Sequence, residues 1–203
     1  LARLSAFGGN GLEIVAQAAS PYIEVDGLRL GVARGAFLQA TGDGEAALVA
    51  WLKANAGGCR KILDLFCGLG TFTLPLARAA AVHAADADKY LIEALDASAR
   101  QARGLKPITP EHRDLYRRPL QNEELKGFDG AVFDPPRAGA EEQARALAAS
   151  KLKRVLAVSC NPNTFARDAK ILVEGGFRLS SIKPVGQFLW SAHVELAARF
   201  ERA

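Results

Sequence analysis

The sequence contains no methionine, only three cysteines and three histidines, and no long apolar run. A membrane-spanning helix needs roughly 18 or more consecutive apolar residues, so none is expected. The start of the chain lacks both an initiator methionine and the pattern of a secretory signal peptide. We expect such a chain to be a processed product or an excised domain, and we favour the excised domain.

Cysteine and histidine are too few and too scattered to predict a disulfide framework or a zinc site. The cysteines are odd in number, and none stands in CxxC spacing or at metal-ligand spacing from a histidine. We therefore expect no metal and a reducing, cytoplasmic environment. The cysteines are Cys59, Cys67 and Cys160, and the histidines are His83, His112 and His193.

The bulk composition is that of an ordinary globular domain with a basic bias. A length of 203 residues supports one sizeable domain with a small appendage, and 49% hydrophobic residues are ample for its core. The net charge of +4 permits an anionic partner, such as a nucleic acid, but does not require one.

Strand patterns alternate with helix patterns from about residue 45 onward, which predicts an α/β fold with a doubly wound, mostly parallel sheet. Two closing strands are expected to form a C-terminal antiparallel hairpin. Upstream, Asp26-Gly27 between two short alternating runs predicts a hairpin with a type I′ turn. We therefore divide the chain into a β-hairpin appendage, or remnant of an upstream region, at 1–34 and a main domain at 35–203. The expected strands are 61–66, 81–85, 107–112, 128–133, 154–158, 177–184 and 192–200, and the expected helices are 45–55, 73–80, 89–104, 141–149 and 165–174.

A glycine-rich loop stands between a buried strand and the helix that follows it. Gly68 and Gly70 let the backbone turn tightly and approach a ligand, and the helix start offers free N–H groups. Asp86 ends the next strand, where an acidic side chain can bind both ribose hydroxyls of a nucleoside. Because the loop is not GxGxxG and no Lys-Ser/Thr follows, a nucleoside without phosphate, such as S-adenosylmethionine (SAM), fits best. The alternative is a mere tight turn, which acidic residues at two successive strand ends, Asp86 and Asp114, make less attractive.

Two further strand ends carry reactive or polar groups. The DPPR run from Asp134 to Arg137 follows a buried strand, and its prolines stiffen the turn and fix the direction of the carboxylate. Such a carboxylate can recognise the edge of a nucleobase; the alternative is a rigid turn with a solvated arginine. Cys160 follows another buried strand, at the edge where open α/β sheets bind ligands, and is a candidate nucleophile. Cys67 has apolar neighbours and is expected to be a packing residue.

Four segments, in this order, resemble the SAM-dependent RNA uracil-C5 methyltransferase family. They are DLFCGLGTF at 64–72, DPPRAG at 134–139, VSCNP at 158–162 and HVE at 193–195. GAFLQ at 35–39 is also similar to the segment before that family's catalytic domain, whose glutamine contacts the methyl donor. The resemblance covers roughly residues 31–203 and implies a class I methyltransferase fold.

The resemblance implies methyl transfer from SAM to C5 of a uridine in RNA, giving 5-methyluridine, with ribosomal RNA favoured over transfer RNA. Cys160 would add to C6 of the uracil, which makes C5 nucleophilic, and Glu195 would remove the C5 proton. We expect a lowered thiol pKa, through nearby arginines or the start of the helix after Cys160. Asp134 would face the base as well as the donor. By position in the motifs, the donor-binding side chains would be those of Gln39, Phe66, Thr71, Asp86, Asp114 and Asp134.

The match departs from the family near the proposed base and at the N-terminal end. The family pattern F-P-x-T-x-H-x-E has Leu189 in place of its proline and Ser191 in place of its threonine. We expect His193 to orient rather than catalyse, and Trp190 to stack on a base or to pack in the core. Relatives carry an N-terminal RNA-binding β-barrel, and some carry a four-cysteine iron–sulfur cluster, which would lie only upstream of this sequence.

Two other functions stay open from the residues alone. A base N-methyltransferase would use the Asp-Pro-Pro loop directly, would form no covalent intermediate and would leave Cys160 idle. A non-catalytic RNA-binding or regulatory domain would keep the fold without turnover. Substitution of the thiol, and trapping with RNA that contains 5-fluorouridine, separate the first of these from C5 methylation.

Overall fold

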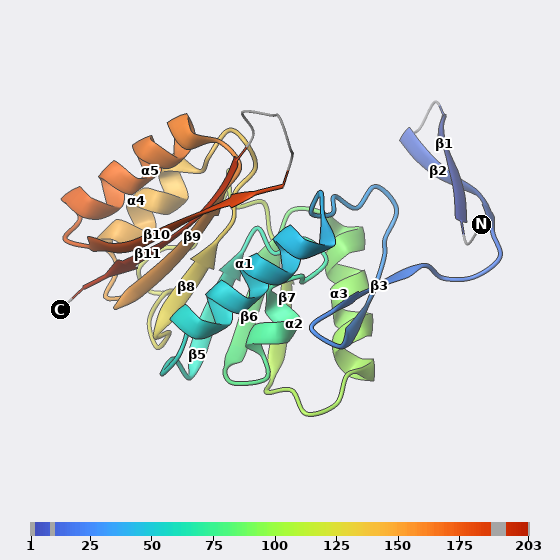
Figure 1. The fold of residues 1–203 in the computed structure, drawn as a ribbon, viewed down its shortest axis with the longest axis horizontal. Coiled ribbons are helices and arrows are strands. Elements are labelled where there is room, and N and C mark those ends of the chain that lie inside the picture. Colours follow the sequence, from blue (N-terminus) through green and yellow to red (C-terminus); the bar gives the residue numbers. More distant parts are fainter. Residues whose placement is uncertain (1–2, 9–10, 188–193, 203) are drawn as a thin grey trace.

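A seven-stranded, mostly parallel sheet forms the centre of the structure, with helices on both of its faces (Figure 1). The computed structural model describes residues 3–8, 11–187 and 194–202. The strand order is β10-β11-β9-β8-β5-β6-β7. The strands are β5 (Lys61–Leu65), β6 (Ala81–Asp86), β7 (Ile108–His112), β8 (Gly130–Phe133), β9 (Arg154–Ser159), β10 (Arg178–Gly186) and β11 (Val194–Glu201).

Side-chain alternation along the strands divides the interior into two apolar cores. On β5, Ile62 belongs to one core, whereas Leu63 and Leu65 belong to the other. Helices α1 (Gly42–Asn55), α2 (Thr73–Leu76) and α3 (Lys89–Gln101) cover the first core, and α4 (Glu141–Ala149) and α5 (Pro162–Glu174) cover the second (Figure 1). Burying each large aliphatic side chain stabilises the fold by roughly 1.5–3 kcal/mol, so the two cores fix the strand ends in place.

The direction in which the sheet grows reverses between β5 and β8. The chain runs outward from β5 to β6 and β7 on one side, and from β8 to β9 on the other. In open α/β sheets, ligands bind at this reversal, outside the carboxyl ends of the strands. The glycine loop after β5 and the DPPR loop after β8 flank this position.

The expected C-terminal hairpin is present, and its second strand is inserted into the sheet. Strand β11 pairs antiparallel with β10 on one side and with β9 on the other. Leu196 on β11 lies opposite Ser159 on β9. This register determines which residue of β11 faces the end of β9.

The N-terminal segment forms two hairpins. Strands β1 (Arg3–Gly8) and β2 (Gly11–Gln17) form one, and β3 (Tyr22–Val25) and β4 (Leu28–Gly31) form the other. The turn between β3 and β4 has positive φ at both Asp26 (52°) and Gly27 (71°), as the predicted type I′ turn requires.

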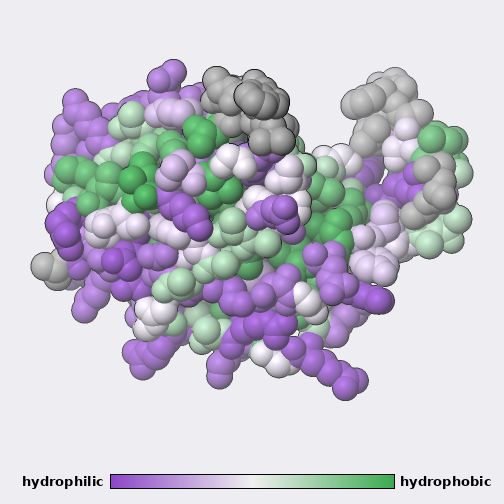
Figure 2. Space-filling view, in the orientation of Figure 1, coloured by the Kyte–Doolittle hydropathy of each residue, from purple (hydrophilic) through white to green (hydrophobic). Residues whose placement is uncertain are grey.

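The two N-terminal hairpins differ in how they meet the rest of the molecule. The β3–β4 hairpin is part of the first core, because Val25, Leu28 and Leu30 are buried there, and the Gly31 N–H donates to the Ser98 hydroxyl on α3 at 3.0 Å. The β1–β2 hairpin stands off from the body of the molecule (Figures 1 and 2). The boundary between residues 34 and 35 stays a prediction, and the core extends across it.

Two expected helices end earlier than their patterns indicate. The helix expected at 73–80 ends at Leu76, because the Ala81 N–H already donates to the Arg60 carbonyl and the intervening residues must form tight turns. Helix α3 ends at Gln101 rather than 104. Every helix in the described part of the chain is too short or too polar to cross a membrane.

Candidate functional site

The glycine loop after β5 is shaped by three residues with positive φ. They are Phe66 (65°), Gly68 (55°) and Gly70 (90°). A Cβ built on Gly70 would lie 2.4 Å from Cδ1 of Leu95 on α3, so the loop approaches α3 more closely than any side chain allows. The sequence prediction of a tight turn at these glycines is confirmed.

Asp86, at the end of β6, holds this loop in place. Its Oδ2 accepts a hydrogen bond from the Gly68 N–H at 3.0 Å, and its Oδ1 accepts one from the Asp88 N–H at 2.9 Å. Asp88 in turn caps α3, accepting from the Tyr90 N–H at 2.8 Å. The carboxylate therefore fixes the glycine loop and the start of α3 relative to each other.

Asp64 is a site residue to which the sequence reasoning gave no role. It is fully buried on β5, and its Oδ2 accepts a hydrogen bond from the Thr73 hydroxyl at 2.5 Å. Its Oδ1 is buried with no hydrogen-bond partner among the described residues. Burial raises the pKa of Asp64 to about 7, and the charge of Asp86 adds to that rise against the opposing Thr73 bond. The signal was a charged residue inside an otherwise apolar strand.

The DPPR loop after β8 is held by the start of α5. The Asn161 amide and the Thr164 hydroxyl both donate to the carbonyl of Arg137, at 2.9 Å and 3.0 Å. Asn161 also caps α5 through the Asn163 N–H. This bracing fixes the loop that begins at Asp134.

Asp134 has a strongly raised carboxyl pKa. Burial raises this pKa to about 8, and the carboxylates of Glu195 and Asp64 add to the rise. A carboxyl group with this pKa is mostly protonated at neutral pH. In that form it donates one hydrogen bond and accepts others.

Cys160 and Glu195 come together through the strand register. Because Leu196 lies opposite Ser159 on antiparallel neighbours, the next residues outward on the two strands are Glu195 and Cys160. The electrostatics agree with this placement: after burial, the carboxylate of Glu195 raises the pKa of the Cys160 thiol most, followed by that of Asp134. The sequence reasoning expected the closing hairpin to bring the late glutamate beside the cysteine strand, and the register does so.

The expected lowering of the Cys160 pKa is wrong. Burial raises the pKa of the thiol, and the carboxylates of Glu195 and Asp134 raise it further; Arg137 opposes them only in part. Burial also raises the pKa of Glu195. The expectation considered arginines and a helix N-terminus, whereas the fold surrounds the sulfur with acidic groups.

The remaining predicted donor-site residues lie around the same strand ends. Gln39 Oε1 accepts from Gln187 Nε2 at 2.9 Å, and the buried Gln187 is a second residue that the sequence reasoning missed. Asp114 Oδ1 caps a turn, accepting from the Tyr116 N–H at 3.0 Å. The Phe66 ring lies 5.5 Å from that of Tyr116, centroid to centroid.

Other residues discussed from the sequence are less central. Thr71 is half-buried within the glycine loop, and Cys67 is buried in the first core, as expected for a packing residue. Leu189, Trp190, Ser191 and His193 lie outside the described residues. Across the described ranges, no group of three or more His, Cys, Asp or Glu side chains could hold a metal ion.

Comparison with known proteins connects this chain to RNA methylation. The sequence profile of the tRNA (uracil-5-)-methyltransferase family matches residues 23–203. An RNA methyltransferase of uncharacterised activity from Rhizobium meliloti is 49% identical over 202 residues, covering 100% of this chain and 48% of that protein. A 23S rRNA (uracil(1939)-C(5))-methyltransferase from Aeromonas salmonicida is 36% identical over 94% of this chain and 44% of its own length. The chain therefore spans about half the length of the curated relatives it matches.

A solved structure supports the same connection. The Pyrococcus abyssi tRNA (uracil-54, C5)-methyltransferase in complex with S-adenosyl-L-homocysteine superposes with a TM-score of 0.79 at 29% identity, covering 93% of this chain and 46% of that one. The predicted class I SAM-dependent methyltransferase fold, with its C-terminal antiparallel hairpin, is confirmed.

Proposed function

The chain belongs to the tRNA (uracil-5-)-methyltransferase family, and we propose that it carries the centre that transfers a methyl group from SAM to C5 of a uridine in RNA. One observation carries the proposal. In the β9–β11 register, Glu195 and Cys160 are the residues just beyond the Leu196–Ser159 pair, at the same end of the sheet as Asp134 and the glycine loop. A candidate nucleophile, two carboxyl groups and a nucleoside-type loop at one edge of the sheet match the needs of C5 methylation.

The residues at the reversal point fit a positively charged methyl donor. SAM carries a sulfonium charge, and the site gathers the carboxyl groups of Asp64, Asp86 and Asp134 around the glycine loop. The buried Oδ1 of Asp64 has no hydrogen-bond partner among the described residues, so it adds a free acceptor beside the glycine loop. Gln39, Phe66, Thr71 and Asp114 are proposed to complete this site. When bound there, SAM supplies the electrophilic methyl group.

The proposed chemistry begins at the sulfur of Cys160. After the thiol proton passes to solvent, the Cys160 thiolate adds to C6 of the uracil, and the C5–C6 electron pair moves toward C5 and the O4 carbonyl. C5 is then nucleophilic and takes the methyl group of SAM. The methyl–sulfur bond breaks, its electron pair returns to sulfur, and S-adenosylhomocysteine leaves. Glu195 then removes the proton from C5. The electron pair of that C–H bond re-forms the C5–C6 double bond and expels the thiolate.

The protonated form of Asp134 has a defined part in this scheme. With a pKa of about 8, its carboxyl group is available to donate a hydrogen bond to a carbonyl oxygen of the uracil, where negative charge develops. A neutral Asp134 also removes one of the carboxylate charges that oppose ionisation of Cys160. Both effects favour addition of the thiolate.

We further propose ribosomal RNA as the substrate. Over the aligned residues, the Aeromonas salmonicida rRNA enzyme is 36% identical to this chain and the Pyrococcus abyssi tRNA enzyme 29%. Methylation of 23S rRNA and tRNA transcripts in parallel tests this choice. The three unpaired thiols fit a protein that works on RNA in a reducing cytoplasm.

Trapping with RNA that contains 5-fluorouridine tests the mechanism. Fluorine at C5 cannot leave as a proton, so the wild-type protein should form a covalent RNA adduct in the presence of SAM, visible as a band of reduced mobility in denaturing gels. Cys160→Ala should form none and should lose methyl transfer. Cys59→Ala, a half-buried thiol at the opposite end of the sheet, is the matched control and should behave as wild type.

Glu195→Gln separates addition from proton removal. This variant should accumulate the adduct on ordinary uridine RNA, because the C5 proton stays in place after methyl transfer. A wild-type protein that methylates RNA while forming no adduct would overturn the mechanism and favour base N-methylation. SAM binding without turnover would favour a non-catalytic domain.

A further inference from the structure

A cleft of about 790 Å³ lies away from the carboxyl groups, between the N-terminal hairpins and α3. The space-filling view shows the β1–β2 hairpin separated from the body by a notch (Figure 2). We call this cleft the Arg–Tyr groove. It is defined by Arg3, Glu13, Tyr22, Arg29, Arg34 and Tyr90.

The Arg–Tyr groove is basic and aromatic. Arg34 stacks over the ring of Tyr90, with its Cζ 3.9 Å from the ring centroid, and Arg29 lies over Tyr22 at 4.5 Å. Both tyrosines remain accessible, since Tyr22 is 53% and Tyr90 47% exposed. Such flat guanidinium and phenol groups stack on unpaired bases, and the guanidinium also binds phosphate.

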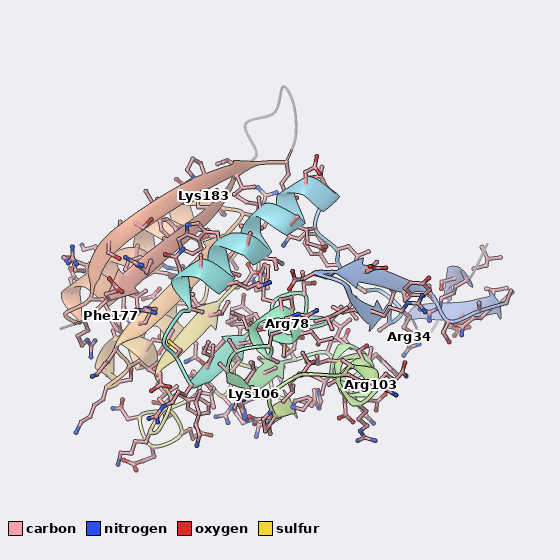
Figure 3. The ribbon with its side chains drawn as sticks, turned by 60° about the horizontal axis from the view of Figure 1, so that its bottom comes forward. Arg34, Arg78, Arg103, Lys106, Phe177 and Lys183 are labelled. Atoms are coloured by element: carbon pink, nitrogen blue, oxygen red, sulfur yellow. The ribbon has the colours of Figure 1, made fainter. Side chains whose placement is uncertain are left out.

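The charges that line the groove favour an anion. Three arginines line it against one acid, Glu13. Arg3 is held in place by two neutral acceptors, because its Nη1 donates to the Val32 carbonyl and its Nε to the Gln17 side chain, both at 2.8 Å. Arg34 comes from the segment after β4 and meets α3 across the groove, on the side of the N-terminal strands (Figure 3).

Two segments that line the groove also carry or contact residues of the proposed donor site. Tyr90 stands in the first turn of α3, and its N–H donates to Asp88, whose own N–H donates to Asp86. On the other wall, Arg34 precedes the donor-site residue Gln39 by five positions in the same segment. A ligand in the groove and a ligand at the carboxyl ends of the strands would therefore be neighbours.

We propose that the Arg–Tyr groove binds a single-stranded stretch of RNA next to the target uridine. This inference rests on the proposed function, since a uridine that enters the pocket must leave its stack and its neighbours must be unpaired. The tyrosines hold neighbouring bases, and the arginines hold the phosphates between them. The groove thus selects RNA that is unpaired around the target, while the pocket selects uracil.

The other candidate occupant is a polypeptide segment. The charges of the residues that line the groove make a polypeptide the less favourable occupant. A polypeptide would need carboxylates to match three arginines, whereas phosphates match them at every nucleotide.

Salt-dependent RNA binding tests the groove. For single strands, the slope of log K against log salt is about −0.7 per phosphate contact, so losing two contacts should reduce its magnitude by about 1.4. We expect this for Arg29→Gln/Arg34→Gln with an unstructured, uridine-containing RNA, measured by fluorescence anisotropy, together with at least about tenfold weaker binding at low salt. Arg29→Lys/Arg34→Lys should keep most of the slope.

The matched control is Arg178→Gln/Lys183→Gln, two exposed cations on β10 at the other edge of the sheet. It should leave the slope near the wild-type value. Equal slopes and affinities for the groove and control variants would overturn the proposal. Unchanged RNA binding by the groove variants, together with lost binding of an acidic peptide, would assign the groove to a polypeptide and overturn the proposal as well.

Two readouts separate this proposal from the proposed function. The groove variants should raise KM for RNA while leaving SAM affinity and kcat near wild type. Cys160→Ala should still show the full salt slope. If wild-type protein never methylates RNA but the groove variants lose binding, the proposed function fails and the groove stands. If RNA is methylated with unchanged KM in the groove variants, the groove fails alone.

Discussion

Replacing Asp134 by asparagine should make the protein more stable, and increasingly so as the pH rises. The folded-state pKa of Asp134 is raised to about 8 by burial and by the facing carboxylates of Glu195 and Asp64. The unfolded chain releases the same proton near the ordinary aspartate pKa of 3.8. Between these two values the folded state binds the extra proton, so the wild-type free energy of unfolding falls as the pH rises.

The expected size follows from proton linkage. One fully linked proton lowers the free energy of unfolding by about 1.4 kcal/mol per pH unit, or about 2.7 kcal/mol between pH 5 and pH 7. An asparagine side chain has no proton to lose, so the Asp134→Asn variant should gain this amount relative to wild type over the same range. Above pH 8, with the wild-type carboxyl ionised in both states, the difference should level off.

Urea unfolding at pH 5, 6, 7 and 8 measures the difference. Asp129→Asn is the control, because the N–H groups of Lys61 and Arg60 lower the pKa of Asp129. Its stabilising effect is present above the unfolded-state pKa and is lost only as the pH falls below it, so this variant should differ from wild type by a constant amount between pH 5 and pH 8. Parallel curves for Asp134→Asn and wild type would refute the reasoning.

Three further outcomes are expected. SAM affinity should increase by up to about tenfold per pH unit between pH 6 and pH 8, because ionised carboxyl groups favour the sulfonium charge. The affinity for the neutral thioether S-adenosylhomocysteine should increase less, and equilibrium dialysis of both ligands measures the difference. Gly70→Ala should lower the free energy of unfolding by about 2–4 kcal/mol, because the new Cβ would lie 2.4 Å from Leu95 and the backbone has a positive φ that alanine disfavours. Gly68→Ala, which has a positive φ but open space around it, should lower it by only about 1–2 kcal/mol in the same urea titration. Leu30→Ala should lower the free energy of unfolding by about 2–5 kcal/mol, because the side chain is fully buried in the first core. A decrease below about 1 kcal/mol would show that the β3–β4 hairpin is a detachable appendage.

The sequence was sufficient for the sheet and for the loops that end its strands. The buried strands were recognisable as apolar runs, and the glycines and prolines after them, such as Gly68 and the DPPR loop, marked where the strands end. The Asp26-Gly27 turn was also predicted correctly, because only a few residue types tolerate positive φ at both central positions.

Electrostatics within the site could not be predicted from the sequence. Asp134, Glu195 and Asp64 are far apart in the chain, and their mutual effect on pKa arises only when three strand ends meet. The hydrogen bond from Gln187 to Gln39 could not be predicted for the same reason, because the two residues are far apart in the sequence. Neither motif spacing nor periodicity contains the distance between side chains on different strands, so the sign of the Cys160 shift was wrong.

The insertion of β11 between β9 and β10 makes this edge of the sheet depend on the order in which its strands fold. Strand β10 precedes β11 in the chain, yet within the described sheet it pairs only with β11. Until β11 is in place, β9 therefore presents unpaired N–H and C=O groups along one side, which another chain can pair with. A chain cut before β11 would keep that open edge and would be prone to aggregation.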